Sequence, residues 1–315
     1  MGNGTLSSGV RGQGCNRRQF ITTTLAGAGV LAAQPALLAA AGRRNRGSGG
    51  QSATDIVTLG QTGIKASRLA HGTGWRGGGR SSAHARLGEK TFTKLIRHSL
   101  DQGVCLIDSA DLYGVHRYIR TALEGVQRDK YVLSTKIWPR TEYWNSPSGG
   151  AKQEVNRFRQ ELKTDILDLC LIHCMTDTEW PQTYERIRDE LSELKQNGIV
   201  RAVGISCHDL GAIKVASTHP WVDVIFARIN NVGKEAQMDA SPEEVAPVLK
   251  QARANGKTVI GMKIFGEGRL TKPDQKDASL KYVWDNGLVD AVTIGMMEPR
   301  EVNDTIRRMN ATLKA

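Results

Sequence analysis

From Asp55 onward, the hydrophobic positions of the chain fall into two alternating patterns. Short runs that are almost wholly apolar and partly β-branched, such as Val104–Asp108, are typical of parallel strands buried on both faces. Longer segments such as Glu89–Gln102 place their apolar residues at helical spacing instead. The pair of patterns recurs eight times over about 260 residues, close to the roughly 250 residues typical of a (β/α)8 barrel. The sequence therefore predicts an α/β fold, a (β/α)8 TIM barrel that forms a single domain.

The boundaries of the predicted elements follow from the apolar runs and the helix caps. Eight strands are expected at 68–74, 104–108, 131–136, 167–173, 200–206, 222–229, 258–264 and 288–294. Helices are expected at 89–102, 116–126, 152–162, 183–196 and 299–309. Another helix should begin at Ser241, where a Ser cap, a Pro in the first turn and two acids fit a helix start. A turn at 61–63 between apolar ends predicts a small β-hairpin, residues 57–65, that closes the bottom of the barrel.

Polar residues close three of the apolar runs. Asp108 ends the second predicted strand, and Tyr113 lies five residues beyond it on the following turn. Lys136 ends the third predicted strand and His173 ends the fourth. Because the strands of a βαβ unit lie side by side and point the same way, their carboxyl ends meet at one rim. These four side chains are therefore expected to lie together.

The four residue types suit proton transfer to a carbonyl oxygen. A tyrosine with an ordinary pKa of about 10 is a poor acid at neutral pH, but an ammonium group within roughly 4 to 6 Å lowers that pKa. Lys136 would supply this charge, and Asp108 would keep Lys136 protonated and fix its direction. His173 would orient a carbonyl oxygen against Tyr113, the general acid. Each residue alone could simply end a strand or form an ion pair, so the functional interpretation rests on all four.

In this order the residues resemble the motifs of the aldo/keto reductases. The family's Asp-Thr-Ala, Tyr-Gly, Thr-Lys and Ile-His motifs correspond to residues 108–110, 113–114, 135–136 and 172–173. The resemblance covers the chain from about Thr54 to its end. It implies a barrel domain at residues 54–315, a nicotinamide cofactor and a small carbonyl substrate. The implied reaction interconverts an aldehyde, a ketone or a sugar and an alcohol, with Tyr113 as general acid.

The resemblance also implies which residues would hold the cofactor. Ser206 keeps the serine that contacts the carboxamide in the family, and Asn230 keeps the asparagine after the sixth strand. Lys263 is a candidate cation for a phosphate. Gly266 and Gly268 are small residues in a loop that would let the backbone approach a pyrophosphate.

The chain departs from the family at other cofactor positions. Cys207, Phe226 and Met262 stand where the family has an asparagine, a glutamine and a ring-stacking aromatic, although Phe226 or Met262 could still cover a nicotinamide by apolar contact. At the adenosine end, Asp304-Thr305 replaces a Glu-Asn pair. Arg300 is the obvious cation for a 2′-phosphate, or simply a solvated charge at a helix start. NADP as the cofactor is therefore an expectation that rests on the family, with NAD left open.

Aromatic side chains are expected to line the substrate pocket. Trp75 ends the first strand and Trp138 directly follows the Thr-Lys motif, and both positions resemble pocket-lining ones in the family. Trp144, in the loop 139–150, would add to them. Aromatic walls suit the apolar face of a sugar or an aryl carbonyl, although each residue could equally be a packing anchor. The long, glycine-rich loop 75–88 is expected to move over the site.

Residues 1–50 have the pattern of an export signal followed by a linker. They hold Arg17 and Arg18, a phenylalanine two places on, a weakly apolar run and an alanine-rich end, which predicts a twin-arginine signal. The apolar run, 21–33, is too short and too polar to span a bilayer, for which about 20 apolar residues are needed. We therefore expect passage through the twin-arginine translocation machinery, a periplasmic or extracellular location and no stable membrane span after cleavage.

Charge and cysteine content argue against several other classes of protein. The chain carries a formal charge of +11, but without the six arginines of residues 1–50 its 43 basic residues fall to 37, against 32 acids. This excess is ordinary, and no basic stripe is interleaved with aromatics, so no nucleic-acid partner is expected. Five cysteines without a CxxC pair favour buried thiols over disulfides. No metal site is expected.

Two other classes of function stay open at this point. A lysine at the end of a barrel strand can form a Schiff base with a carbonyl substrate, so Lys136 could be the nucleophile of a lyase. Alternatively, the departures at Cys207, Phe226 and Met262 could mark a barrel that binds a nucleotide or a sugar without turnover.

Overall fold

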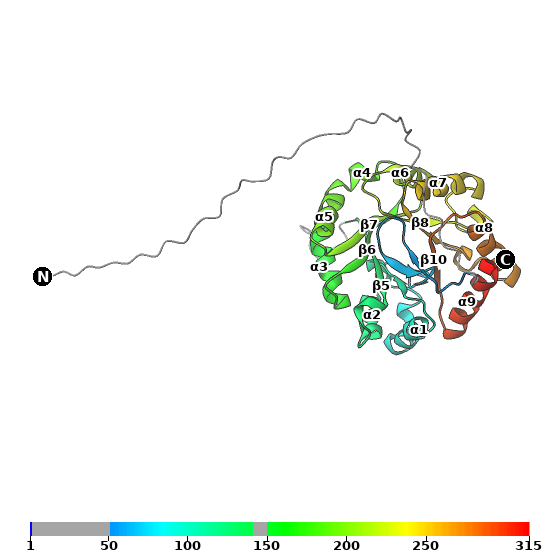
Figure 1. The fold of residues 1–315 in the computed structure, drawn as a ribbon, viewed down its shortest axis with the longest axis horizontal. Helices are drawn as coiled ribbons and strands as arrows, with labels where there is room; N and C mark the ends of the chain where they lie inside the picture. The colour runs from blue at the N-terminus through cyan, green and yellow to red at the C-terminus, as the bar shows by residue number, and fades with distance from the viewer. Residues whose placement is uncertain (2–50, 141–149, 315) are drawn as a thin grey trace, which may run out of the picture. The chain divides into compact units, whose positions relative to one another are not determined.

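Eight parallel strands close into a barrel in the order β10-β3-β4-β5-β6-β7-β8-β9, with helices around the outside (Figure 1). The computed structural model describes Met1, residues 51–140 and residues 150–314. The predicted (β/α)8 fold is confirmed. The barrel strands are β3 (Leu69–Gly72), β4 (Leu106–Asp108), β5 (Val132–Ile137), β6 (Leu167–Met175), β7 (Val200–Cys207), β8 (Val224–Arg228), β9 (Thr258–Met262) and β10 (Ala291–Gly295).

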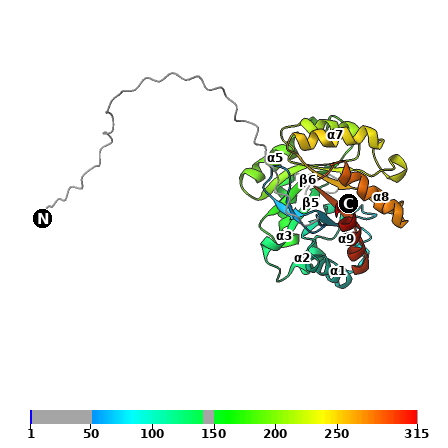
Figure 2. The same cartoon turned by 45° about the vertical axis from the view of Figure 1, so that its right-hand side comes forward.

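Helices follow the strands and cover the outside of the barrel, as Figures 1 and 2 show from two directions. They are α1 (Glu89–Asp101), α2 (His116–Leu123), α3 (Ala151–Leu162), α4 (Trp180–Thr183), α5 (Glu185–Gln196), α6 (Leu210–Thr218), α7 (Pro242–Ala254), α8 (Pro273–Asp285) and α9 (Pro299–Lys314). The predicted cap of α7 is confirmed. The Ser241 hydroxyl accepts a hydrogen bond from the Glu244 N–H, and the Glu244 carboxylate accepts one from the Ser241 N–H.

A short hairpin closes one end of the barrel, as predicted. Its strands, β1 (Ile56–Thr58) and β2 (Lys65–Ser67), pair antiparallel, and the hairpin lies across the barrel in Figure 1. Leu59 and Ile64, next to these strands, are fully buried in the same cluster as the inward-facing Leu106 of β4. Burial of an aliphatic side chain of this size contributes about 1.5 to 3 kcal/mol. The hairpin therefore completes the apolar core inside the barrel.

The structure corrects several predicted boundaries. β10 begins three residues later than expected, because Leu288 and Val289 are buried in the turn before the strand. These two buried turn residues extend the apolar run beyond the strand itself, so the prediction started the strand too early. The helix predicted at 183–196 is interrupted at Tyr184, where φ is −112° and ψ is 29°, so that α4 and α5 are separate. The last helix continues to Lys314 rather than ending at Met309.

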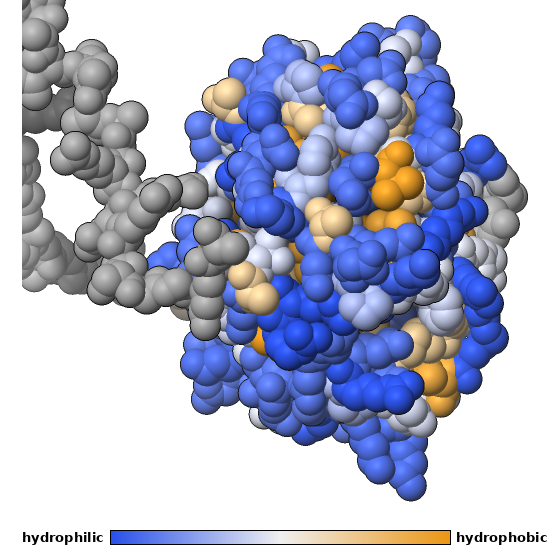
Figure 3. All heavy atoms as spheres, turned by 90° about the vertical axis from the view of Figure 1, so that its right-hand side faces the viewer, coloured by the Kyte–Doolittle hydropathy of each residue, from blue (hydrophilic) through white to orange (hydrophobic). Residues whose placement is uncertain are grey.

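The surface that carries α8 and α9 is mostly hydrophilic, with small and separate apolar spots (Figure 3). Of the described barrel residues, the large hydrophobic ones that are exposed are Ile56, Ile166 and Val232. Such scattered residues are normal for a folded surface. Within residues 51–140 and 150–314, no helix is long and apolar enough to cross a membrane. Residues 2–50, with the predicted signal, and Trp144 lie outside the described residues.

Candidate active site

A cavity of about 300 Å³ opens where the barrel strands end. The structure brings Asp108, Tyr113, Lys136 and His173 together in its wall. From these residues the cavity extends along the ends of β9 and β10 to the first turns of α9. Its other lining residues include Gly72, Trp75, Ser206, Met262, Lys263, Glu267, Gly268, Lys276, Thr293, Met297, Glu301, Asp304 and Thr305.

Lys136 is held by an ion pair inside the barrel. Its Nζ pairs with Asp108 Oδ1 and donates a hydrogen bond of 2.9 Å to the Ser109 carbonyl oxygen. Asp108 also accepts hydrogen bonds from the hydroxyls of Ser134 at 3.2 Å and Thr293 at 3.1 Å. Burial lowers the pKa of Lys136, while the charge of Asp108 raises it. These contacts fix the direction of the ammonium group.

Phe226 lies against this lysine rather than in the wall of the cavity. The Lys136 Nζ lies 4.6 Å from the centroid of the Phe226 ring, which is fully buried in the barrel core. Met262, in contrast, does line the cavity. Of the two residues expected to cover a nicotinamide, the structure therefore places only Met262 where it could do so.

Tyr113 packs its ring against the loop that follows β3. A Cβ added to Gly74 would lie 2.3 Å from this ring, so a glycine is required for the ring to approach the loop. The Tyr113 Oη lies 3.4 Å from His173 Nε2, and the Lys136 Nζ lies 5.6 Å from the centroid of the Tyr113 ring. A hydroxyl, an imidazole and an ammonium group thus surround one end of the cavity.

The predicted lowering of the tyrosine pKa is wrong. Burial raises the pKa of Tyr113 above its ordinary value, and the charge of Asp108 raises it further. The Asp108 carboxylate offsets the charge of Lys136, so the ammonium group does not outweigh the cost of burying a phenolate. Tyr113 is therefore protonated at neutral pH, which is the form that a proton donor requires.

His173 reaches the cavity from an irregular stretch of β6. The pairing register of β6 with β7 shifts between residues 172 and 175, and Cys174 adopts a positive φ of 68°. The Ser206 hydroxyl accepts a hydrogen bond of 2.8 Å from the Cys174 N–H at this bulge. Burial, followed by the charge of Lys136, lowers the pKa of His173 well below its ordinary value. The imidazole is therefore neutral and can donate or accept one hydrogen bond at each nitrogen.

The structure brings three of the six predicted cofactor residues to the cavity. Ser206, Lys263 and Gly268 line it, whereas Gly266, Asn230 and Arg300 do not. The Arg300 side chain is 85% exposed and pairs with Glu298. Its charge is therefore directed to solvent, as expected for an ordinary cation at a helix start.

Asn230 is buried in the turn after β8. Its amide nitrogen donates to the carbonyl oxygens of Ala236 at 2.9 Å and Lys263 at 3.2 Å. Its amide oxygen accepts from the N–H groups of Val232 and Gly233. Both ends of the side chain are thus used by the backbone, and Asn230 shapes the turn instead of facing a ligand.

The predicted aromatic walls are partly in place. Trp75 lines the cavity, and Trp138 lies edge-on to His173 with 5.6 Å between ring centroids. Trp138 does not line the cavity itself, but it packs against His173, which does. The prediction for Trp144 falls outside the described residues.

Two acids that the sequence interpretation did not select also line the cavity. Glu267 pairs with Lys263 at 2.8 Å, and Glu301 accepts a hydrogen bond of 2.7 Å from the Met297 N–H. Glu267 lies between Gly266 and Gly268, and Glu301 directly follows Arg300. An acidic residue in a segment that is expected to bind phosphate is the sequence signal that points to Glu267 and Glu301.

The loop after β3 is fastened to the far end of the cavity by a buried histidine pair. His84 Nε2 lies 3.0 Å from the Met296 carbonyl oxygen, and the rings of His71 and His84 meet edge to face at 5.7 Å. Burial lowers the pKa of His71 to about 3 and that of His84 to about 4. The folded protein therefore keeps both rings neutral at pH values where the unfolded chain protonates them.

This pair should make the protein less stable in mild acid. Because the pKa values of His71 and His84 are lowered in the folded protein, their contribution to stability is fully present above about pH 6.5 and is lost as the pH falls. At each histidine the loss amounts to about 1.4 kcal/mol per unit of difference between the folded and unfolded pKa. We expect the free energy of unfolding, measured in urea, to fall between pH 7 and pH 5. In His84→Gln this fall should be smaller by about 1 to 2 kcal/mol. An unchanged pH dependence in that variant would contradict the assignment.

Sequence comparison places the chain in a known family. The profile of the Aldo/keto reductase family matches residues 68–314, and the chain belongs to this family. Aldo-keto reductase YhdN of Bacillus subtilis is 31% identical over 163 residues, which are 48% of this chain and 46% of YhdN, so the match spans about half the length of that relative. The 6-dehydroglucose reductase of Novosphingobium aromaticivorans is 28% identical over 240 residues, 68% of this chain and 70% of the relative. The NADH-specific methylglyoxal reductase of Escherichia coli is 25% identical over 238 residues, 70% of each chain.

Solved structures of aldo-keto reductases share the fold. One from Pseudomonas aeruginosa superposes with a TM-score of 0.68 at 23% identity and covers 84% of this chain and 98% of that one. Another, from Klebsiella pneumoniae in complex with NADP and acetate, superposes with a TM-score of 0.59 at 17% identity, covering 82% and 90%. At these identities the likeness concerns the fold.

The residues of the cavity fit a nicotinamide nucleotide, which the family implies. A continuous cavity connects Tyr113 to the start of α9, with the apolar Met262 near the tyrosine and the bare backbone of Gly268 farther along. In this arrangement Ser206 and Met262 would hold the nicotinamide end. Among residues 51–140 and 150–314, no group of three or more acidic, histidine or cysteine side chains is placed to bind a metal ion.

Proposed function

We propose that this protein is an oxidoreductase that interconverts a small carbonyl compound and an alcohol with a nicotinamide nucleotide. The observation that carries the proposal is the meeting of Tyr113, His173 and the Lys136–Asp108 pair at one end of a long cavity. A protonated hydroxyl beside a neutral imidazole is what carbonyl reduction needs from the protein.

The chain's own residues would act in defined roles. His173 orients the substrate oxygen next to the Tyr113 Oη, and Tyr113 donates its proton to that oxygen. Lys136 stabilises the negative charge that develops on the tyrosine, while Asp108 holds the ammonium group in place. A bound reduced nicotinamide supplies the hydride. The neutral His173 places no positive charge on the substrate oxygen, so charge stabilisation comes from the buried lysine.

The relatives suggest which carbonyl compounds to test. One relative is named for the reduction of 6-dehydroglucose, an oxidised glucose, and another for the reduction of methylglyoxal. Purified protein should oxidise NADH or NADPH in the presence of at least one compound from a panel of small aldehydes, dicarbonyls and sugar ketones. Binding of a nucleotide without turnover of any member of that panel would favour the non-catalytic alternative.

The Schiff-base alternative has less support from the geometry. Lys136 is buried, and its Nζ is engaged by Asp108 and by the Ser109 carbonyl oxygen. A nucleophilic amine must lose its proton and approach the substrate carbon. Burial lowers the pKa of Lys136 and so favours loss of the proton, but the ion pair with Asp108 opposes it. The two hydrogen bonds of Nζ oppose the approach to a substrate carbon.

We propose NAD(H) rather than NADP(H) as the preferred nucleotide. With the nicotinamide next to Tyr113, the adenosine half extends to the far end of the cavity, which is lined by Glu301, Asp304 and Lys276. A 2′-phosphate adds about −1.5 to −2 charges and would be repelled there by the Glu301 carboxylate, whereas Asp304 is already paired with Arg307 and Arg308. A carboxylate instead suits a ribose 2′-hydroxyl, to which it can accept a hydrogen bond. The NADH-specific relative from Escherichia coli is consistent with this preference.

Direct binding tests the nucleotide preference. By calorimetry, NADH should bind at least about tenfold more tightly than NADPH, a difference of about 1.4 kcal/mol. Glu301→Gln should strengthen NADPH binding severalfold with little effect on NADH, because it removes a charge and keeps an acceptor for the Met297 N–H. Glu185→Gln, at an exposed acid on α5 that does not line the cavity, serves as the control. Tighter binding of NADPH to the wild-type protein would overturn the preference and leave the proposed reaction intact.

We also propose that the protein is exported through the twin-arginine pathway. The proposal rests on the sequence pattern around Arg17 and Arg18, in a segment outside the described residues. Replacing both arginines by lysine keeps the charge but removes the pair that the translocation receptor reads. We expect the variant precursor to stay in the cytoplasmic fraction. Unchanged export of the lysine variant would show that the pattern was misinterpreted.

A further inference from the structure

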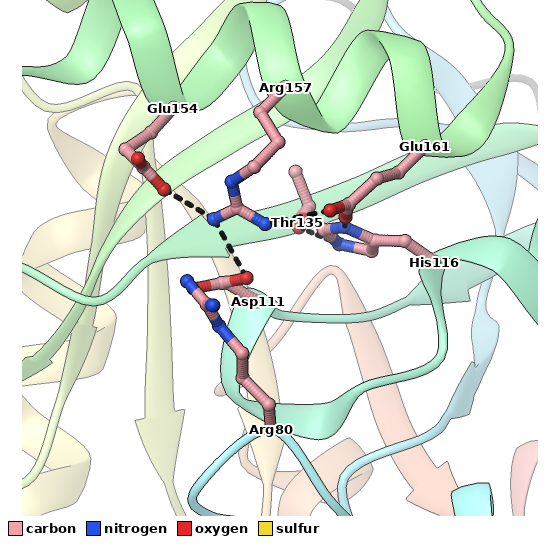
Figure 4. Close-up of polar contacts among 7 residues, drawn as sticks. All are labelled: Arg80, Asp111, His116, Thr135, Glu154, Arg157 and Glu161. Carbon is pink, nitrogen blue, oxygen red and sulfur yellow. Dashed lines mark hydrogen bonds and ion pairs between the residues drawn. The ribbon is translucent and has the colours of Figure 1, made fainter. Parts of the chain in front are cut away.

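A buried ion network joins the turn that carries Tyr113 to helix α3 on the outside of the barrel (Figure 4). Its centre is Arg157, on α3, whose side chain is only 13% exposed. The Arg157 guanidinium contacts three carboxylates. Nη2 lies 2.9 Å from Asp111 Oδ1 and also pairs with Glu154, and Nη1 lies 2.9 Å from Glu161 Oε1.

Asp111 connects this network to the proton donor. It begins the short helix η2 (Asp111–Tyr113), two residues before Tyr113, and its side chain is 4% exposed. On the opposite side of the turn, Arg80 lies 3.4 Å from Asp111 Oδ2. Gly114, which ends the turn, has a positive φ, and a Cβ there would lie 2.1 Å from the Arg80 carbonyl oxygen. The turn is thus held between α3 and the loop after β3.

A second branch of the network reaches the strand that carries Lys136. Glu161 Oε2 lies 2.9 Å from His116 Nδ1, and His116 Nε2 lies 2.8 Å from the hydroxyl of Thr135. Thr135 directly precedes Lys136 in β5. Burial opposes the charge of Glu161, but His116 and Arg157 lower its pKa to about 2, so the Glu161 carboxylate stays ionised at neutral pH.

We propose that Arg157 is a positioning residue that fixes Tyr113 and Lys136 relative to each other. A guanidinium group is planar and donates hydrogen bonds in several fixed directions, so it can bind carboxylates on two sides at once. The ammonium group of a lysine cannot reproduce this geometry. Through Asp111 it fixes the turn of Tyr113, and through Glu161 and His116 it fixes β5 next to Lys136. Misplacement of reacting groups by about 1 Å can cost about 10²-fold in rate. This inference rests on the proposed function, in which Tyr113 donates a proton to the substrate.

The first test separates positioning from nucleotide binding. Arg157→Lys and Asp111→Asn should each lower kcat by about tenfold to 10²-fold, with the dissociation constant for NADH within about twofold of wild type. If the two substitutions act through the same Arg157–Asp111 contact, kcat of the double variant should be little lower than kcat of either single variant. Arg159→Lys, two residues further along α3, is the matched control. Arg159 donates a hydrogen bond to the carbonyl oxygen of the exposed Asp165 and does not contact the turn that carries Tyr113. Wild-type kcat in Arg157→Lys, or fully independent effects of the two substitutions, would overturn the proposal.

A second readout does not depend on turnover. The protein can be labelled with 3-fluorotyrosine, and the fluorine resonance of position 113 assigned by its absence in Tyr113→Phe. Arg157→Lys should broaden, split or shift this resonance, while Arg159→Lys should leave it unchanged. An unaltered resonance in Arg157→Lys overturns the positioning role. If the resonance changes but the wild-type protein reduces no carbonyl compound, the positioning role stands and the proposed function fails.

Discussion

Tyr113→Phe is expected to lower the rate of carbonyl reduction by about 10² to 10⁴, the range for loss of a positioned acid. The phenyl ring keeps the packing against Gly74 but has no proton to give. The dissociation constant for the nucleotide should stay near the wild-type value, because the hydroxyl contributes to the step that follows binding. Steady-state kinetics with a carbonyl substrate, together with calorimetry for the nucleotide, measure the two quantities separately.

The pH dependence provides the control for this assignment. Because burial raises the pKa of Tyr113, the donor stays protonated from neutral pH to above pH 10, and reduction should not fall over that interval through loss of the donor. Oxidation of the alcohol needs the phenolate and should therefore become faster as the pH rises. Wild-type kcat in Tyr113→Phe would refute the proton-donor role. A change in the wild-type rate with pH near neutrality that is absent from Tyr113→Phe would mean that Tyr113 titrates there, and would refute the raised pKa.

Lys136→Met is expected to damage both the rate and the stability. Without the ammonium group, the charge that develops on Tyr113 loses its nearest buried cation, and the rate should fall by about 10² or more. The same change leaves the buried Asp108 carboxylate without its partner, which typically costs about 3 to 5 kcal/mol. Urea unfolding and steady-state kinetics on the same preparation give both effects.

A double variant separates the two consequences of losing Lys136. In Lys136→Met with Asp108→Asn, no unpaired charge remains, so part of the stability should return. The rate should stay low, since the ammonium group is still missing. Recovery of the rate in the double variant would mean that Lys136 acts only by neutralising Asp108. An undiminished rate in Lys136→Met alone would exclude the lysine from the mechanism.

Much of the fold could be predicted because it is encoded in local patterns. Runs such as Val104–Asp108 are apolar throughout since both faces of a parallel strand are buried, and the hairpin has a clear turn between apolar ends. Strand direction then brings Asp108, Lys136 and His173 to one rim without any further information. The start of β10 was predicted too early because Leu288 is as fully buried in the preceding turn as a strand residue would be.

Other features could not be predicted because they depend on three-dimensional surroundings. The direction of the Tyr113 pKa shift depends on how deeply the side chain is buried and on which charges surround it, and the structure shows that burial and the charge of Asp108 both raise this pKa. Asn230 has the residue type of a ligand contact, yet the backbone of its turn uses every polar atom of the side chain. The network of Arg157 joins residues from α2, α3, β5 and two loops, which no spacing along the chain reveals.

The most direct test of the proposed function follows the transferred hydrogen atom. Purified protein is incubated with methylglyoxal or another active member of the carbonyl panel and with NADH that carries two deuterium atoms at its reactive carbon. The product is then analysed by mass spectrometry. One deuterium on the former carbonyl carbon is expected with the wild-type protein, and its formation should be strongly slowed in Tyr113→Phe. Undeuterated product, or a Schiff base on Lys136 that borohydride reduces to a stable amine while the NADH is left intact, would contradict the assignment.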